Sequence, residues 1–277
     1  MARKGYVNRI LPFSFVDGPG NRSVVFLQEC NLHCAYCHNP ETINLCNSCG
    51  ACVRGCPTGA LRLKAGRVEW NALRCVACDS CLQTCERSAS PRVERLTASE
   101  VMERLRSALP CISGITVSGG ECTLQQEFVT ELIEHAHACG KPVFLDTNGM
   151  LDFQRMPALT KAMDQAMLDV KATDPAEHRV LTGKSNETVL QNLKYLADIG
   201  KLYEIRTVVV PGSLNNHRTV DEASKMIAGT DVRYKLIWFR PQGVRGPLAG
   251  TPMPDDLLMS ELAALAGHNG VKDIEIV

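Results

Sequence analysis

Eleven of the fourteen cysteines in this 277-residue chain lie between Cys30 and Cys85. In a short secreted chain this density would predict disulfides. Here the N-terminal segment is basic but has no sustained apolar run and no small-residue cleavage site, so we expect a cytoplasmic protein. In a reducing compartment, a dense group of cysteines predicts metal binding instead. The spacing of these cysteines therefore constrains the fold and the function more than any other feature.

Charge and hydropathy exclude two classes of partner. The 30 basic residues balance the 30 acidic ones, and no run of about 18 apolar residues is present, so we expect neither nucleic-acid binding nor a membrane span. Aromatic residues make up only 5% of the chain, which also disfavours a nucleic-acid binder. Residues 45–92 carry seven basic and three acidic residues. This local excess indicates either docking of an acidic redox partner or a chance distribution of surface arginines.

The order of apolar segments predicts an α/β fold in which residues 45–92 interrupt a domain formed by residues 1–44 and 93–277. Thr97 and Glu100 form a capping box that predicts a helix start. Apolar runs that predict strands alternate with amphipathic segments, which indicates a parallel sheet, either doubly wound or a barrel. The expected strands are 24–27, 114–118, 142–146, 165–170, 203–210, 236–239 and 271–277, and the expected helices are 101–109, 124–139, 185–199, 217–228 and 254–266.

Unusual polar residues and cysteines follow the carboxyl ends of these strands. Because such ends meet at one rim in a β/α barrel, their positions favour the barrel over the doubly wound sheet. The segments are Cys30–Cys37, Gly119–Glu121, Asp146–Gly149, Asp169–Lys171 and Arg240.

The first three cysteines have the spacing C-x3-C-x2-C, with Cys30, Cys34 and Cys37 in one loop after a strand. A cubane [4Fe–4S] cluster held by three thiolates keeps one iron open to a substrate, which indicates catalysis rather than electron carriage alone. The alternative is a zinc site with His33 or His38 as fourth ligand.

Together with other motifs, this loop resembles the activating enzymes of glycyl radical enzymes, which belong to the radical S-adenosylmethionine (SAM) superfamily. The resemblance runs over nearly the whole chain, and the layout most resembles the YjjW type. It rests on the cysteine loop with His38-Asn39 and on the segments 16–22 (VDGPGNR), 118–121 (SGGE), 146–149 (DTNG), 167–171 (MLDVK) and 206–212 (RTVVVPG).

The resemblance implies a partial (β/α)6 barrel and a radical reaction. One electron from the cluster cleaves SAM, and the 5′-deoxyadenosyl radical removes a hydrogen atom from a glycine of a partner glycyl radical enzyme. Asp17 would meet the glycine loop of that partner, or else belong to a rigid turn. Flavodoxin or ferredoxin is the usual electron donor. Two alternatives stay open, a radical SAM enzyme with a small-molecule substrate and a non-enzymatic electron carrier.

The remaining eight cysteines form two runs that match the bacterial ferredoxin spacing, C-x2-C-x2-C-x3-C. In two-cluster ferredoxins the fourth cysteine of each run binds the other cluster. We therefore expect two accessory [4Fe–4S] clusters, which relay electrons or serve a structural role. A zinc site is the alternative. One cluster would be held by Cys46, Cys49, Cys52 and Cys85, and the other by Cys75, Cys78, Cys81 and Cys56.

The resemblance also implies residues that hold SAM and a monovalent cation. Arg240 stands near the place where the family usually has a histidine, and an arginine there would suit the SAM carboxylate. The cation would be bound by Asp146, Thr147, Asp169 and the Met167 carbonyl, unless Lys171 and backbone amides satisfy the two carboxylates. The expected SAM contacts are Tyr36, Cys37, His38, Asn39, Gly119, Gly120, Glu121, Asp146, Thr147, Asn148, Asp169, Val170, Lys171, Arg206 and Arg240.

Overall fold

The computed structural model describes residues 2–241, 244 and 248–277. Its largest element is one nine-stranded sheet with the order β11-β10-β9-β8-β7-β6-β2-β1-β5. The strands are β1 (Lys4–Ser14), β2 (Arg22–Leu27), β5 (Glu94–Thr97), β6 (Gly114–Gly119), β7 (Val143–Thr147), β8 (Gln165–Asp169), β9 (Leu202–Val209), β10 (Arg233–Trp238) and β11 (Ile274–Ile276).

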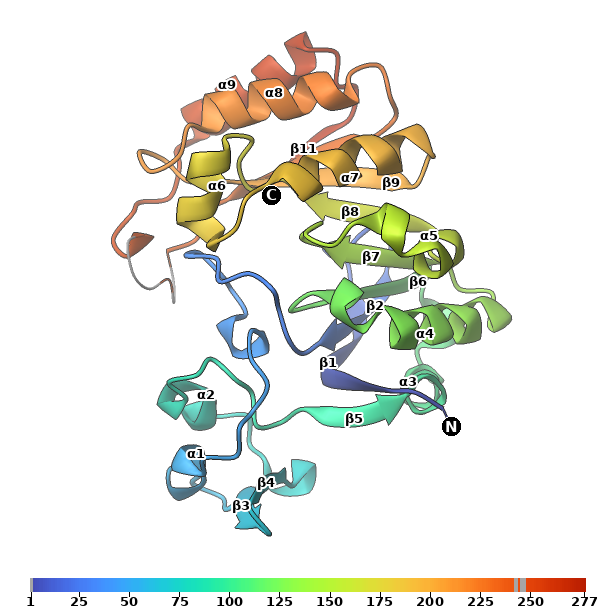
Figure 1. The fold of residues 1–277 in the computed structure, drawn as a ribbon, viewed down its shortest axis with the longest axis vertical. Helices are drawn as coiled ribbons and strands as arrows, with labels where there is room; N and C mark the ends of the chain where they lie inside the picture. Colours follow the sequence, from blue (N-terminus) through green and yellow to red (C-terminus); the bar gives the residue numbers. More distant parts are fainter. Residues whose placement is uncertain (1, 242–243, 245–247) are drawn as a thin grey trace.

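All seven predicted strands are present, as β2, β6, β7, β8, β9, β10 and β11, and these seven are parallel to one another. Their order in the sheet follows the chain without a reversal. Because parallel crossovers are right-handed, this order places the connecting helices on one side of the sheet and excludes the doubly wound alternative. Figure 1 shows the helices along the outer side of a curved sheet. They are α3 (Ala98–Leu105), α4 (Gln126–Ala138), α5 (Pro157–Ala162), α7 (Glu187–Asp198), α8 (Asn216–Ile227) and α9 (Asp256–His268).

Several elements were not predicted. Strands β1 and β5 extend the sheet in the antiparallel direction. The sequence of β1 contains Pro12 and lacks a regular alternation, whereas β5 has only four residues. Helices α5 and α6 (Pro175–Thr182) are also short. Short or irregular elements carry too little periodicity to be recognised from the sequence.

The alternation of side chains along the strands separates the core from the site. On β6 and β7, Ile115, Val117, Val143 and Leu145 pack into the core beneath the helices. The residues between them point to the inner face, where Thr116 and polar neighbours lie. The predicted capping box is confirmed, since the Thr97 side chain accepts from Glu100 N–H and the Glu100 carboxylate accepts from Thr97 N–H.

Residues 45–92 form a separate lobe at the edge of the main sheet (Figure 1). The lobe contains α1 (Ala51–Arg54), the hairpin β3 (Leu61–Lys64) and β4 (Arg67–Trp70), and α2 (Ser80–Thr84). Its two ends are joined where Asn44 N–H donates to Ser88 O and Ser90 N–H donates to Glu41 O. Among the described residues, none of the helices combines the length and the apolar composition that a membrane-spanning segment requires.

Candidate functional site

A cavity lies at the carboxyl ends of the parallel strands, where the sequence pattern places the functional residues. It brings the cysteine loop of residues 30–39 together with the ends of β6, β7, β8 and β9. Its lining includes Cys30, Cys34, Tyr36, Cys37, His38, Asn39, Ser118, Gly119, Gly120, Asp146, Thr147, Asn148, Asp169, Lys171, Arg206, Val208 and Ile237. Ser118, Val208 and Ile237 were not predicted. Ser118 belongs to the SGGE motif and Val208 to the RTVVVPG motif, but nothing in the sequence singles out Ile237.

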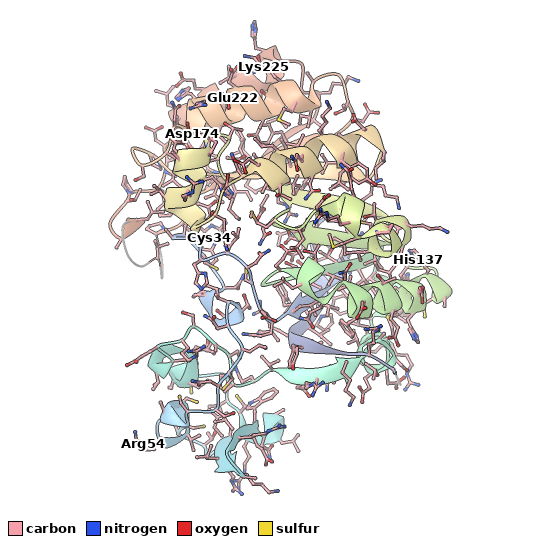
Figure 2. All side chains as sticks on the ribbon, in the orientation of Figure 1. Cys34, Arg54, His137, Asp174, Glu222 and Lys225 are labelled. Carbon is pink, nitrogen blue, oxygen red and sulfur yellow. The ribbon has the colours of Figure 1, made fainter. Side chains whose placement is uncertain are left out.

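The cysteine loop is held by backbone hydrogen bonds from two sides. Cys30 N–H donates to Ile43 O at 2.9 Å, and Ala35 N–H donates to Leu181 O of α6 at 2.9 Å. Cys34 lies on this loop next to α6 (Figure 2). Burial raises the pKa of the Cys30 thiol to about 12 and that of Cys37 to about 11. These thiols therefore stay protonated unless a bound metal displaces the proton.

The chemistry of the loop suits an iron–sulfur cluster better than a single metal ion. In the part of the chain that the structure describes, no three His, Cys, Asp or Glu side chains converge closely enough to hold one ion. The zinc alternative requires four ligands around a single ion. Three half-buried cysteines that line a polar cavity fit a cluster with one open iron.

Gly119 and Gly120 bring the end of β6 against the cysteine loop. A Cβ on Gly119, whose φ is +119°, would lie 2.2 Å from Leu27 N, and one on Gly120 would lie 2.1 Å from Glu29 O. Only glycine permits this approach. Gly120 N–H donates to Leu27 O at 2.9 Å, and the next N–H, that of Glu121, donates to Glu29 O at 2.8 Å. The Gly-Gly pair thus has a structural role in addition to its predicted contact with SAM.

Glu121 lies outside the cavity lining and is only 1% exposed. Its Oε1 accepts from Thr123 N–H at 3.0 Å and from Thr147 Oγ1 at 2.7 Å. Its Oε2 accepts from Asn148 N–H at 2.7 Å. Glu121 is therefore placed to join the turn after β6 to the turn after β7, rather than to contact SAM as predicted. Asn148, positioned in this way, donates to Asn31 Oδ1 at 2.8 Å.

The cavity contains two ion pairs. Arg206 Nη1 lies 3.0 Å from Asp146 Oδ1, and Lys171 Nζ lies 2.7 Å from Asp169 Oδ2. Arg206 also contacts Glu204 through Nε at 2.5 Å. Burial lowers the pKa of Arg206, but Asp146 and Glu204 raise it above its usual range. Burial raises the pKa of Asp146 to about 6, and the Arg206 charge opposes this rise.

The residues expected to bind a monovalent cation do not fit one in this arrangement. Arg206 and Lys171 already neutralise Asp146 and Asp169, and Thr147 Oγ1 donates to Glu121. The alternative from the sequence, in which Lys171 satisfies a carboxylate, matches this geometry, with Arg206 as a second positive charge. The role of Arg206 inside the site, predicted because a lone buried charge is costly, agrees with these pairs.

Four other predicted residues do not line the cavity. Val170 is fully buried in the core, so a side-chain contact with SAM is excluded by its position. Arg240 is exposed, so its predicted contact with SAM gains no support. Met167 is buried, and its Sδ lies 2.9 Å from Arg206 Nη2. Asp17 lies in the loop between β1 and β2, and its carbonyl oxygen accepts from Thr116 Oγ1 at 2.6 Å.

Four cysteines of the lobe lie together as the spacing predicts. A second, smaller cavity is lined by Cys56, Cys75, Cys78 and Cys81, so the fourth cysteine of the first run lies with the second run. Burial raises the pKa of the Cys52 thiol to about 11, and the nearby Cys46, Cys81 and Cys85 raise it further. The assignment of Cys46, Cys49, Cys52 and Cys85 to one cluster stays a prediction.

The sequence of residues 24–222 matches the family model of the radical SAM superfamily. The chain is 32% identical to the choline trimethylamine-lyase activating enzyme of Oleidesulfovibrio alaskensis, over 76% of this chain and 74% of that protein. The chain belongs to the radical SAM superfamily, and within it to the glycyl radical enzyme activating enzymes. It is an enzyme that activates a glycyl radical enzyme, as its motifs predict.

Two further comparisons span almost the whole activating enzyme. It is 28% identical to the indoleacetate decarboxylase activating enzyme of Tractidigestivibacter scatoligenes, over 98% of this chain and 97% of that protein. The structure of QueE from Escherichia coli superposes with a TM-score of 0.53 at 11% identity, over 99% of this chain and 94% of that one. The second comparison shows the fold alone, a mixed α/β fold with a large parallel sheet.

The buried position of Glu121 generates a prediction. Each carboxylate oxygen accepts from a backbone N–H. In Glu121→Gln, either orientation of the amide would therefore place its NH2 group against one of these N–H donors. Glu121→Gln is expected to lower the free energy of unfolding by about 1–3 kcal/mol and to weaken SAM binding through displacement of Asn148. Urea unfolding and SAM titration of the reconstituted protein measure both effects. Glu134→Gln, at an exposed position on α4, is the control, and equal behaviour of the two variants would contradict the role of Glu121.

Proposed function

We propose that this activating enzyme holds three [4Fe–4S] clusters, one catalytic and two accessory. The curved sheet would be the partial (β/α)6 barrel of its family, and residues 45–92 its ferredoxin-like insert. Cys30, Cys34 and Cys37 would hold the catalytic cluster. The observation that carries this proposal is the single cavity in which these three cysteines face Gly119, Gly120 and two carboxylate–cation pairs.

The charged groups of the cavity match the charged ends of SAM. Asp146 and Asp169 suit the positive amino group, and Lys171 and Arg206 suit the carboxylate. Tyr36 and the backbone of residues 37–39 border the same space and would bind the adenosine part. A cluster held by Cys30, Cys34 and Cys37 would supply one electron that breaks the C5′–S bond of SAM into methionine and a 5′-deoxyadenosyl radical, and this radical would take a hydrogen atom from the partner's glycine. The chain's residues bind, orient and shield the reactants, and none of them needs to act as an acid or a base.

The partner is a glycyl radical enzyme, and we propose that its glycine loop approaches beside Asp17. Burial is the largest cause of the raised pKa of Asp146, and the negative charges of Asp169 and then Asp17 raise it further. The carboxylates of Asp17 and Asp146 therefore lie near each other. Phe15 and Val16, next to Asp17, are each 77% exposed. Large apolar side chains at this exposure suit contact with another protein.

Electrons would reach the catalytic cluster through the insert, from a flavodoxin or a ferredoxin in the cytoplasm. A chain of backbone hydrogen bonds leads from the insert to the cysteine loop. Ser88 N–H donates to Cys85 O, Asn44 N–H donates to Ser88 O, and Cys30 N–H donates to Ile43 O. This close connection favours electron relay over a purely structural role of the insert.

Metal content tests the cluster assignment. The anaerobically reconstituted protein is expected to bind about 12 irons, and its Cys30/Cys34/Cys37→Ala variant about 8, because one cubane is lost. Iron and sulfide analysis with EPR of the reduced protein measures this. Stoichiometric zinc, or about 4 irons in the wild type, would overturn the assignment.

A substitution at Asp17 separates SAM cleavage from radical transfer. Asp17→Asn is expected to leave uncoupled cleavage of SAM unchanged and to lower the yield of glycyl radical by about tenfold, because a charge-assisted contact with the partner is lost. Production of 5′-deoxyadenosine and the glycyl radical EPR doublet are the two readouts. Asp198→Asn, at an exposed position on α7, serves as the control. Equal radical yields from the two variants would argue against the contact.

A further inference from the structure

The cavity of the insert contains two side-chain donors besides its four cysteines. Trp70, the last residue of β4, and Arg92 both border the space lined by Cys56, Cys75, Cys78 and Cys81. Neither residue is part of a cysteine motif. A role for them at a cluster rests on the proposed function, in which these four cysteines hold an accessory cluster.

Trp70 presents a buried donor to this space. Its indole Nε1–H is inaccessible to solvent and has no partner of good hydrogen-bond geometry within the described residues. A buried donor without an acceptor costs about 1–3 kcal/mol. The sulfurs of Cys56, Cys75, Cys78 and Cys81 border the same space. A sulfur of the cluster bound there would be the acceptor that this indole lacks.

Arg92 supplies a positive charge to the same cavity. Its guanidinium lies 2.8 Å from Asp79 Oδ1 and is mostly buried, with the side chain 20% exposed. The ion pair with Asp79 fixes the orientation of the guanidinium against the cysteine run.

Two cysteines of this group lie beside hydroxyl groups. Cys78 Sγ is 3.4 Å from Ser80 Oγ, and Cys56 Sγ is 3.9 Å from Thr58 Oγ1. Once the thiols are thiolates, the hydroxyls are the donors. Two of the four cysteines thus have hydroxyl donors beside them. In the other group, Cys52 is buried among further cysteines, and Cys46 Sγ lies 3.4 Å from the backbone N–H of Ser48.

We propose that Trp70 and Arg92 donate hydrogen bonds to sulfurs of the cluster held by Cys56, Cys75, Cys78 and Cys81 and thereby raise the reduction potential of this cluster above that of the other accessory cluster. Reduction adds one negative charge to a cluster, and donors to its sulfurs stabilise that charge. The cluster of Cys56, Cys75, Cys78 and Cys81 is then the first of the two to accept an electron. The reduced flavin or iron–sulfur protein that donates loses one electron in the same step.

An EPR-monitored redox titration of the reconstituted, full-length protein tests the proposal. Added SAM changes the signal of the catalytic cluster and so identifies it. Trp70→Phe and Arg92→Gln are each expected to make one accessory cluster about tenfold harder to reduce, which is about 59 mV for a one-electron couple, and to leave the other unchanged. Arg92→Lys, which keeps the charge, should restore part of the shift. Arg62→Gln, which removes an exposed arginine of the same insert, is the control.

The outcomes separate this inference from the proposed function. If the wild type binds about 12 irons but neither Trp70→Phe nor Arg92→Gln changes an accessory potential, this inference is overturned and the proposed function stands. An equal shift in both accessory clusters, or the same shift in Arg62→Gln, would also overturn it. A wild-type protein with about 8 irons and one accessory signal would overturn the inference together with the two-cluster insert. If Trp70→Phe fails to assemble its cluster, the two Arg92 variants decide the question.

Discussion

The close backbone contact between Gly119-Gly120 and the segment Leu27–Glu29 is the constraint on which the site depends. Two hydrogen bonds join these segments at a separation that admits no Cβ. The contact fixes the cysteine loop over the end of β6, and the buried Glu121 extends it to the turn after β7. A cluster and a bound cofactor thus meet residues from several strands with little rearrangement, which is how a rigid scaffold supports radical chemistry.

The charged residues on the inner face of the sheet are arranged in pairs of opposite charge. Asp146, Asp169 and Glu204 are costly to bury alone, and Arg206, Lys171 and Lys235 lie within 3.3 Å of them. Such pairs add little net stability, because desolvation offsets the attraction. Four of these residues, Asp146, Asp169, Lys171 and Arg206, place charges of both signs along the wall of the cavity. The same pairs explain why the residues expected to hold a monovalent cation do not fit one.

Much of the fold was predictable because the strands carry strong signals. Apolar β-branched runs such as that of β9 locate the parallel sheet, and the polar residues after each strand locate its functional edge. The spacing of the cysteines predicts that Cys56 lies with the second run, and Cys56 lines one cavity together with Cys75, Cys78 and Cys81. Glu121 and Arg240 were expected at the main cavity but do not line it, since a motif reports which residues are near a site but not which way they point. Strand β1 was not predicted because its own sequence has no strand-like alternation. It is a strand because it pairs with β2 and β5.

The most direct test of the account is the reaction itself. The reduced, reconstituted protein is mixed anaerobically with SAM and a glycyl radical enzyme from the same organism, and 5′-deoxyadenosine and the glycyl radical doublet are quantified beside a Cys34→Ala control. The account predicts that the wild type gives both products and that the variant gives neither, because its catalytic cluster loses a ligand. Equal amounts of 5′-deoxyadenosine from the two proteins would contradict it.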